Sequence, residues 1–337
     1  MIDQQAGQAT DRGLEGGEVL RHYWHPVAHS REVADRPLAV KLLDQPLVLW
    51  RAGGQVAAFY DLCVHRGTPL SLGWIDDDQL VCPYHGWCYA GDGTCTRIPA
   101  LLPGRAIPRK ARAVAYHVQE RYGLVWVCLD EPRADIPAFP PEVDDPSYRW
   151  EAYSSDGVWQ ANVARMVENL ADYSHFAWVH PGTLGDREHP ECQDVTIEPI
   201  DGGFQYEIVQ PVNRLLQESP TIQRFQVILP FMIVIQRFQP GGPERQTNVY
   251  VFTPISPKQT RFFRLSGRNY RDRLPDEELN RRHQLTFEQD RVIVEAQRPE
   301  ALPLDLSEEL HLRGPDAAAI EYRRRLRELG VGWQWSA

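Results

Sequence analysis

The stretch CVHRGTPLSLGWIDDDQLVCPYH, residues 63–85, holds two cysteines and two histidines within twenty-three residues. Cys63 and His65 form one half, Cys82 and His85 form the other, and sixteen residues separate them. A glycine follows each pair within two residues, so each half predicts a tight loop whose backbone amides point at a bound group. The chain has six cysteines in all, irregularly spread, which is not a disulfide framework. Clustered Cys and His in such a chain indicate a metal site.

The composition and length limit the classes of protein to which the chain can belong. The chain has 337 residues with 36 basic and 46 acidic side chains, a formal net charge of −10, and its basic residues are scattered. Nucleic-acid binding is therefore not expected, because phosphate contacts need a concentrated basic face. The N-terminus is polar, and no run of eighteen apolar residues occurs, so we expect a cytoplasmic protein without a membrane span. The length predicts about two domains.

Two cysteines and two histidines could bind a structural zinc ion or an iron–sulfur cluster. Zinc fingers usually pair Cys with Cys and His with His, whereas each half here supplies one of each. In a Rieske [2Fe–2S] centre two thiolates hold one iron and two imidazoles hold the other, which raises the reduction potential to roughly −150 to +300 mV. The pattern C-x-H-R-G followed by C-x-x-H-G-W resembles the Rieske motif and favours the cluster. Cys88 has no obvious cysteine partner in the first loop, so we expect a cluster site without a disulfide.

The remaining sequence predicts an α+β organisation. Short apolar runs with turn signals over residues 39–129 indicate an all-β unit, and a proline-rich joint follows at 131–146. We predict a first domain over 18–133 and a second over 134–337. The second should contain a helix over 161–179, strands between 194 and 269, and two closing helices over 275–297 and 317–329, the last ending at Gly330. The run VILPFMIVI, residues 227–235, indicates a buried strand pair broken at its proline.

A second constellation lies within VENLADYSHFAWVHPG, residues 167–182. Asn169, Asp172 and His175 follow at i, i+3 and i+6, along one side of a regular helix. His180 lies five residues past His175, too far around an ideal helix for both imidazoles to reach one ion. His180 precedes a proline, however, which biases it away from helical geometry, so we predict that the helix ends or widens there. The two histidines are then candidate ligands of one iron.

The candidate third ligand is Asp290. On the expected helix over 275–297, Asp290 lies at the centre of an apolar stripe that includes Phe287, Ile293 and Val294. A carboxylate in a core is costly unless it is paired or bound to a metal, and the alternative to a ligand is an ion pair with a buried arginine. Two histidines and one carboxylate form the facial triad of non-haem Fe(II) oxygenases, which leaves coordination positions for O2.

With both constellations in this order, the chain resembles the catalytic α subunits of the Rieske non-haem iron oxygenases, in the group of vanillate O-demethylase and phthalate oxygenase. The segments ERYGLVWVCLDEP, ENLADYSHFAWVH and EQDRVIVEAQRP carry the resemblance, and the C-terminal AIEYRRRLRELGV is similar to the Rieske hydroxylases of saxitoxin biosynthesis. The resemblance covers the chain from about residue 23 and implies a Rieske domain followed by a helix-grip catalytic domain. It also implies a head-to-tail homotrimer in which Asp172 connects His175 to His85 of the next copy. The role of Asn169 is left open.

The resemblance further implies the cofactors, partners and reaction. A separate NAD(P)H-dependent reductase or ferredoxin passes electrons to the [2Fe–2S] cluster and then to Fe(II), where O2 is activated. One oxygen atom enters a small substrate, either as hydroxylation or as O- or N-demethylation. The alternatives are cis-dihydroxylation of an aromatic ring, by enzymes with α chains usually longer than this one, and a Rieske electron carrier without catalytic iron. The strand segments 225–238 and 247–255 are largely apolar, so we expect a mainly hydrophobic or aromatic substrate. The other histidines are interpreted as structural or surface residues.

Overall fold

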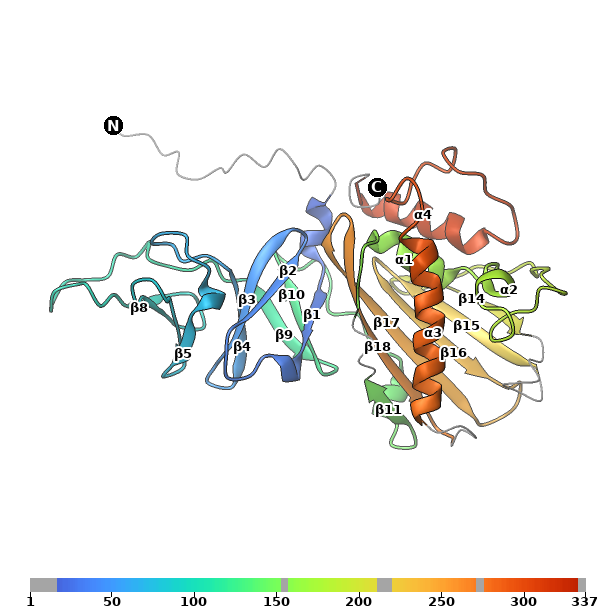
Figure 1. Cartoon of the computed structure of the whole chain (residues 1–337), viewed down its shortest axis with the longest axis horizontal. Coiled ribbons are helices and arrows are strands. Elements are labelled where there is room, and N and C mark those ends of the chain that lie inside the picture. The colour runs from blue at the N-terminus through green and yellow to red at the C-terminus, as the bar shows by residue number, and fades with distance from the viewer. Residues whose placement is uncertain (1–16, 153–156, 211–219, 271–275, 333–337) are drawn as a thin grey trace.

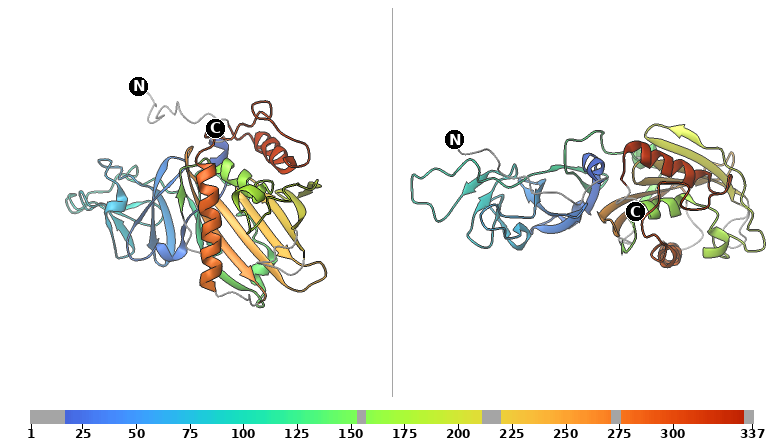
Figure 2. Two further views of the ribbon diagram at one scale, coloured as in Figure 1. Left: turned by 45° about the vertical axis from the view of Figure 1, so that its right-hand side comes forward. Right: turned by 90° about the horizontal axis from the view of Figure 1, so that it is seen from above.

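The computed structural model describes residues 17–152, 157–210, 220–270 and 276–332. The chain folds into an all-β N-terminal region and a C-terminal region built around one large antiparallel sheet with a few helices (Figure 1). Viewed from above, the two regions lie end to end along the long axis of the molecule (Figure 2). The predicted α+β class is confirmed.

The N-terminal region contains three small antiparallel sheets. Strand β10 is central to one of them, and all five residues of LVWVC are buried, because the sheet is covered on both faces. The two loops that hold the cysteines and histidines lie outside the regular strands, before β5 and between β6 and β7. The sheets are β1 (His25–His29), β10 (Leu124–Cys128) and β9 (His117–Arg121); β2 (Leu38–Leu42), β3 (Gln45–Ala52) and β4 (Gln55–Tyr60); and β5 (Trp74–Asp76), β6 (Gln79–Val81), β7 (Cys88–Tyr89) and β8 (Cys95–Arg97).

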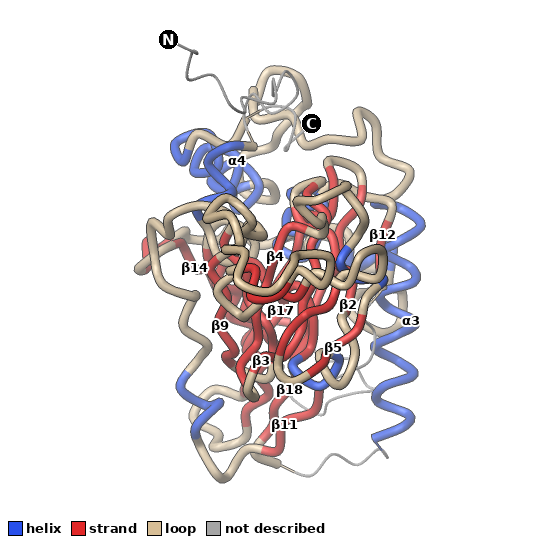
Figure 3. Tube along the Cα trace, turned by 90° about the vertical axis from the view of Figure 1, so that its left-hand side faces the viewer, coloured by secondary structure: helices blue, strands red, loops and turns tan. Residues whose placement is uncertain are grey.

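The C-terminal sheet has the strand order β11-β18-β17-β16-β15-β14-β13, with β12 also paired to β18. All the pairings are antiparallel, and the turn at 229–231 joins β15 to β16 as the sequence predicts. Viewed along the long axis, α3 runs beside these strands (Figure 3). The strands are β11 (Arg149–Ala152), β12 (Val158–Trp159), β13 (Glu198–Ile200), β14 (Gly203–Gln210), β15 (Thr221–Ile228), β16 (Met232–Phe238), β17 (Arg245–Ser256) and β18 (Gln259–Arg268).

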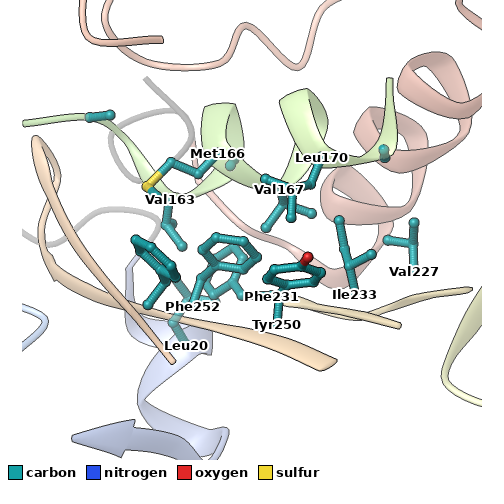
Figure 4. Close-up of a cluster of buried hydrophobic side chains, with 14 of the residues drawn as sticks. Leu20, Val163, Met166, Val167, Leu170, Val227, Phe231, Ile233, Tyr250 and Phe252 are labelled. Atoms are coloured by element: carbon teal, nitrogen blue, oxygen red, sulfur yellow. The ribbon is translucent and has the colours of Figure 1, made fainter. Parts of the chain in front are cut away.

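Helices α1 (Val163–Ala171) and α3 (Asp276–Val294) cover one face of this sheet, which we call the inner face. Apolar side chains of α1 point down onto the strands and the adjoining turn and form a continuous core with them (Figure 4). The side chains labelled there are Leu20, Val163, Met166, Val167, Leu170, Val227, Phe231, Ile233, Tyr250 and Phe252.

The opposite, outer face of the sheet packs against the N-terminal region and the proline-rich joint. Val249, Val251 and Phe263 of the sheet share a core with Trp126 of β10 and Phe139 of the joint. Nine consecutive residues of β17 are buried because both faces of this strand are covered. The predicted proline-rich joint therefore connects the two regions and packs against the outer face of the sheet.

Backbone hydrogen bonds also connect the two regions. The amides of Leu43 and Asp44 donate to the carbonyl groups of Pro254 and Ile255, each at 2.8 Å. The Thr253 hydroxyl donates to a carbonyl of β1. Main-chain pairing of this kind fixes the position of one region against the other more strongly than a flexible linker would.

Two helix predictions hold with small corrections. Helix α4 (Ala317–Leu329) ends at Gly330, whose φ of +79° lets its amide bond back to the carbonyl of Arg327. Helix α3 ends at Val294, three residues before the predicted end. The prediction of one helix over 161–179 is wrong, and its break is described with the site below.

Candidate active site

The two loops of the N-terminal site have the same backbone hydrogen-bond pattern. Gly67 donates to the carbonyl of Cys63 at 2.9 Å, and Gly86 donates to the carbonyl of Cys82 at 3.0 Å. Both glycines have positive φ, +70° and +66°, which an L residue adopts only with strain. The sequence predicted these loops from the position of the glycines. The repeated turn aims the cysteine and histidine of each loop at the same space.

The side chains of this site pair by type. Both thiols are buried, with Cys63 2 % and Cys82 1 % exposed, and the adjacent imidazoles of His65 and His85 have ring centroids 4.5 Å apart. Burial raises the pKa of the Cys82 thiol, and the neighbouring Cys63 thiol raises it further. The Nδ1 atom of His65 is buried without a hydrogen-bond partner, which is costly unless the atom binds a metal. A sulfur pair beside a nitrogen pair fits a Rieske [2Fe–2S] centre.

The geometry also bears on the zinc alternative. Ligand atoms around one tetrahedral zinc ion lie about 4 Å or less from one another. Among the described residues, three or more His, Cys, Asp or Glu ligand atoms lie within 4.8 Å of one another at His175, His180 and Asp290, and not in the N-terminal loops. The loops therefore fit a larger group better than a single ion. All six cysteines are unpaired, and Cys88 is buried in β7, consistent with a cluster site that has no disulfide.

The C-terminal site forms where the predicted helix breaks. Helix α1 ends at Ala171, Asp172 adopts an extended conformation, and α2 (Phe176–Val179) begins only after His175. The expected single helix side for Asn169, Asp172 and His175 is therefore wrong, because residues 172–175 form a turn. Asp172 stabilises this turn, because its Oδ1 atom accepts a hydrogen bond from the Ser174 amide at 2.7 Å.

His180 leaves helical geometry as its proline neighbour predicts. It is the C-cap of α2, with φ −120° and ψ 52°, and its carbonyl accepts backbone amides of the following turn. This conformation brings its imidazole beside that of His175, with ring centroids 5.2 Å apart. The predicted convergence of the two histidines is therefore present, although the helix break begins earlier than expected.

Asp290 completes the group from α3. Its Oδ1 atom lies 3.0 Å from Nε2 of His180 and 3.4 Å from Nε2 of His175. His180 and Asp290 are 1 % and 6 % exposed, and both His180 Nε2 and Asp290 Oδ1 lack a hydrogen bond. Buried atoms in this state fit a bound cation. In the part of the chain that the structure describes, the groups beside Asp290 Oδ1 are these two imidazoles rather than a buried arginine.

The other ring nitrogen of each histidine has its own partner. Nδ1 of His175 lies 3.1 Å from Oδ2 of Asp172, and Nδ1 of His180 lies 2.9 Å from Oε1 of Gln289. Because both partners are acceptors, Nδ1 carries the proton in each ring, and Nε2 offers its lone pair toward Asp290. The sequence analysis missed Gln289, although its position directly before Asp290 placed it on the adjacent helix face.

The electrostatics of the site favour positive charge. Burial alone would raise the pKa of Asp172. Hydrogen bonds from His175 and Ser174 together have the larger effect, so the pKa of Asp172 is lower than usual. The carboxylate of Asp172 thus stays ionised beside His175. Burial alone would lower the pKa of His180. The neighbouring Asp290 and Gln289 side chains together have the larger effect, so the pKa of His180 is higher than usual. The Oδ1 atom of Asn169 is buried and lacks a hydrogen bond, which agrees with a position near this site but leaves its role open.

The apolar stripe that located Asp290 is confirmed in part. Phe287 and Val294 are buried on the same helix face, but Ile293 is 48 % exposed, so its expected place in the stripe is wrong. The expected apolar wall is present on β15 and β16, whose inner-facing residues are mainly apolar. On β17 and β18 the inner face also carries polar side chains, among them Asn248 and Arg264. Apolar residues of the outer face alternate with these along β17, so the sequence alone predicted an apolar wall there too.

Comparisons with known proteins match each region of the chain to a known family. The Rieske [2Fe-2S] domain family matches residues 23–113, and the vanillate O-demethylase oxygenase C-terminal domain family matches residues 159–331. The chain is 34 % identical over 326 residues to the methylxanthine N1-demethylase NdmA of Pseudomonas putida, covering 93 % of this chain and 90 % of that one. Among the described residues, no helix is both long and apolar enough to cross a bilayer.

Solved structures agree as well. The structure of NdmA from Pseudomonas putida CBB5 with caffeine superimposes with a TM-score of 0.85 at 32 % identity, covering 94 % of this chain and 92 % of that chain. Dicamba monooxygenase bound to dicamba has a TM-score of 0.77 at 26 % identity, covering 92 % and 97 %. These relatives support monooxygenation over dihydroxylation and over a carrier without catalytic iron.

Proposed function

Because the chain belongs to the Rieske non-haem iron oxygenases, as a catalytic α subunit, we propose that it demethylates a small aromatic molecule at oxygen or nitrogen. It is an oxidoreductase that uses O2 and takes electrons from a reductase or ferredoxin. The observation that carries the proposal is the convergence of His175, His180 and Asp290 next to the inner face of the sheet. The relative NdmA named above removes a methyl group from methylxanthines, according to its name.

The ligand assignments are part of this proposal. Cys63, His65, Cys82 and His85 would hold the [2Fe–2S] cluster, and His175, His180 and Asp290 would hold the mononuclear iron. When bound, the cluster supplies single electrons and the iron supplies the position at which O2 is reduced. We assign the first role to residues 18–133 and the second to residues 134–337.

The reaction balances with one NAD(P)H for each methyl group. A substrate R–X–CH3, in which X is oxygen or a substituted nitrogen, reacts with O2, NAD(P)H and a proton. The products are R–X–H, formaldehyde, water and NAD(P)+. One oxygen atom enters a C–H bond of the methyl group, and the resulting O–CH2–OH or N–CH2–OH carbon leaves as formaldehyde. The other oxygen atom becomes water.

The chain's own side chains position and protect this chemistry. Gln289 and Asp172 fix the rings of His180 and His175 through their Nδ1 atoms. Burial of His180 and Asp290 keeps bulk water away from the site and strengthens the attraction of both for a cation. Apolar packing of α1 on the sheet holds the helix break in place.

The positions of the two sites in one chain support the proposed homotrimer. The cluster loops lie beside β5, at one end of the molecule, and α2 lies toward the other end (Figure 1). A site in a second copy is a better electron donor than one across the length of the same chain. His85 is exposed, and the Asp172 side chain is 28 % exposed, so each can contact another copy. We propose that Asp172 joins His175 to His85 of a neighbouring subunit.

Iron-loaded protein, NADH and a surrogate reductase test the reaction directly. Methoxybenzoates and methylxanthines are supplied in turn, and formaldehyde and the demethylated product are measured against NADH consumed. One formaldehyde for each NADH is expected with the correct substrate. A product that keeps its methyl group and gains two hydroxyl groups would contradict demethylation and indicate dihydroxylation.

A further inference from the structure

The two ends of the long axis carry opposite charge, although the chain as a whole is acidic. Residues 97–112, the basic segment, contain five basic side chains and no acidic one. Residues 186–201, the acidic segment, contain six acidic side chains and one arginine. The basic segment begins at the last residue of β8, at one end of the molecule, and the acidic segment follows α2 toward the other end (Figure 1). Identical copies with this charge distribution attract each other head to tail.

The basic segment lies against the loops that hold the proposed cluster ligands. A Cβ atom on Gly86 would lie 3.2 Å from Cγ of Pro99, so the segment passes close to the second loop. Ile98 and Ile107 pack on the core that contains both loop cysteines. The position of the segment beside the cluster loops is therefore fixed by packing.

The acidic segment lies beside the helix break of the proposed iron site. The Tyr173 hydroxyl donates a hydrogen bond to the Gln193 carbonyl, which holds the segment next to Asp172. Val195 and Ile197 pack against the main core of the C-terminal region. Each segment is therefore a fixed neighbour of one of the two sites.

The charged side chains of both segments are exposed and largely unpaired. Arg112 forms an ion pair with Asp92 at 3.3 Å, and the other four basic side chains of its segment form none with the described residues. Arg187 of the acidic segment donates to the Trp178 carbonyl at 3.1 Å. Across the described chain, no ion pair neutralises the six acidic side chains. The exposed side chains are Arg97, Arg105, Arg109, Lys110 and Arg112 in the basic segment, and Asp186, Glu188, Glu191, Asp194, Glu198 and Asp201 in the acidic segment.

Exposed apolar side chains lie among these charges. Leu101 and Leu102 of the basic segment are 36 % and 70 % exposed. Trp178 of α2 is 59 % exposed, and the Arg187 guanidinium lies 5.7 Å from the centroid of its ring. An apolar centre with a polar, charged rim is typical of a specific protein interface. Each end of the molecule has both parts.

We propose that the basic segment of one copy binds the acidic segment of the next copy, with Leu101 and Leu102 against Trp178. This inference rests on the homotrimer of the proposed function and names the surfaces that hold it together. The contact lies beside His85 of one copy and Asp172 of the next, so the charges set the register of that junction. Repulsion between like charges prevents two identical ends from meeting.

Exchanging the charges of the two segments tests the contact. Protein loaded with cluster and iron is followed by sedimentation velocity at 0.1 M NaCl, without substrate. Arg109→Glu with Lys110→Glu should raise the concentration at which half of the assembly dissociates by about 10- to 100-fold, because like charges then meet. Glu188→Lys with Glu191→Lys should have an effect of similar size. All four substitutions in one chain should return that concentration to within about threefold of the wild-type value, because opposite charges meet again.

Two controls separate the contact from net charge and from misfolding. Arg31→Glu with Arg36→Glu is the matched control, because both arginines are exposed outside the two segments and the change in net charge is the same. This control should dissociate like the wild type. Cluster absorbance and thermal melting check that every variant is folded.

Salt provides a second measurement on the unmodified protein. Raising NaCl from 0.1 to 1 M should raise the dissociation concentration of the wild type by about tenfold or more, since the screening length falls from about 10 Å to about 3 Å. The variant with all four exchanged charges should show the same salt dependence, whereas each double charge reversal should associate better at high salt.

The inference is disproved if the wild type assembles but Arg109→Glu with Lys110→Glu dissociates no more readily than the control, or if exchanging all four charges does not restore assembly. It is also disproved if that double variant assembles normally but accepts electrons poorly from the reductase, because the basic segment then binds the reductase. A wild type that is monomeric at every concentration would contradict the homotrimer as well. Because no substrate is present, a failure of demethylation would leave this inference standing.

Discussion

The N-terminal site is assembled locally, whereas the C-terminal site is assembled by the whole fold. The four proposed cluster ligands come from two loops with the same turn, within residues 63–85. The three proposed iron ligands come from a broken helix at 175–180 and from Asp290, more than one hundred residues later. The first site needs the correct loop, and the second also needs the sheet that brings α3 against α1. The predictions below test whether the two sites depend on each other.

The largest effect is expected from Asp290→Ala. The variant should lose the mononuclear iron and all product formation, because two neutral imidazoles bind a hard cation weakly without the carboxylate. The N-terminal site is built from other segments, so its cluster should remain. Iron and acid-labile sulfide analysis would then show about two irons and two sulfides per chain. Loss of the cluster as well would show that the two sites are not independent.

Asp172→Asn should keep both metals and nearly stop turnover. The Asn side chain still accepts a hydrogen bond from His175 but removes the negative charge that we propose connects two subunits. We expect product formation to fall by about 100-fold or more, in the range found for wrongly polarised histidine partners. Single-turnover kinetics with prereduced protein would localise the loss to electron delivery. A variant with the normal rate would disprove the bridge.

The pH dependence of stability should report on His25, a buried histidine outside both proposed metal sites. Burial lowers the pKa of His25 to about 4, despite its hydrogen bond with the Leu20 carbonyl, whereas the unfolded value is about 6.5. The unfolded chain therefore binds the proton first, and stability falls as the pH drops from about 6.5 to 4, by roughly 3 kcal/mol. His25→Gln should flatten this dependence in thermal melts between pH 4.5 and 7.5. An unchanged slope would contradict the assignment.

Gln289→Leu should weaken iron binding at the C-terminal site. The amide oxygen holds the proton of His180 on Nδ1, so its loss allows the wrong tautomer and a mobile ring. Outer partners of metal ligands typically change metal affinity by about 10- to 100-fold. Competition with a chelator measures this directly, and Gln289→Glu should recover most of the affinity. Gln284→Leu, at an exposed position of the same helix, is the control.

The smallest effect is expected at the N-terminal site, from Tyr89→Phe. The Tyr89 hydroxyl lies 3.1 Å from Sγ of Cys63. A hydrogen bond to a ligand sulfur stabilises the reduced cluster, so its removal should lower the reduction potential by roughly 20 to 60 mV, the equivalent of about 0.5–1.5 kcal/mol for one electron. A redox titration followed by visible absorbance measures the shift. A higher potential would show that the hydroxyl does not donate to the sulfur.

The same contrast explains what the sequence could and could not predict. The proposed cluster ligands could be predicted from spacing alone, because a short loop fixes the geometry of residues that are close in sequence. Gly330 as a helix end and the strand pair at 227–235 were also local features and are confirmed. His180 was correctly expected outside the helix, because proline restricts its neighbour.

The errors occurred where tertiary contacts decide the structure. The turn at Asp172 replaces a helix that the sequence pattern allows, since Asp172 bonds to its own chain and to His175 instead. The polar inner face was not visible in the sequence because β17 is covered on both sides, so residues of two different environments alternate in one apolar run. No local pattern distinguishes the side that faces α3 from the side that faces Trp126.

The backbone hydrogen bonds from Leu43 and Asp44 to the end of β17 have a kinetic consequence. They hold the N-terminal region against the sheet, which disfavours a swing of the proposed cluster toward the proposed iron site of the same chain. Reducing equivalents would then reach the iron only after subunits associate, and specific activity should decline on dilution below the concentration at which the assembly dissociates. Domain motion would give a rate that does not depend on protein concentration, and activity followed across a dilution series distinguishes the two cases.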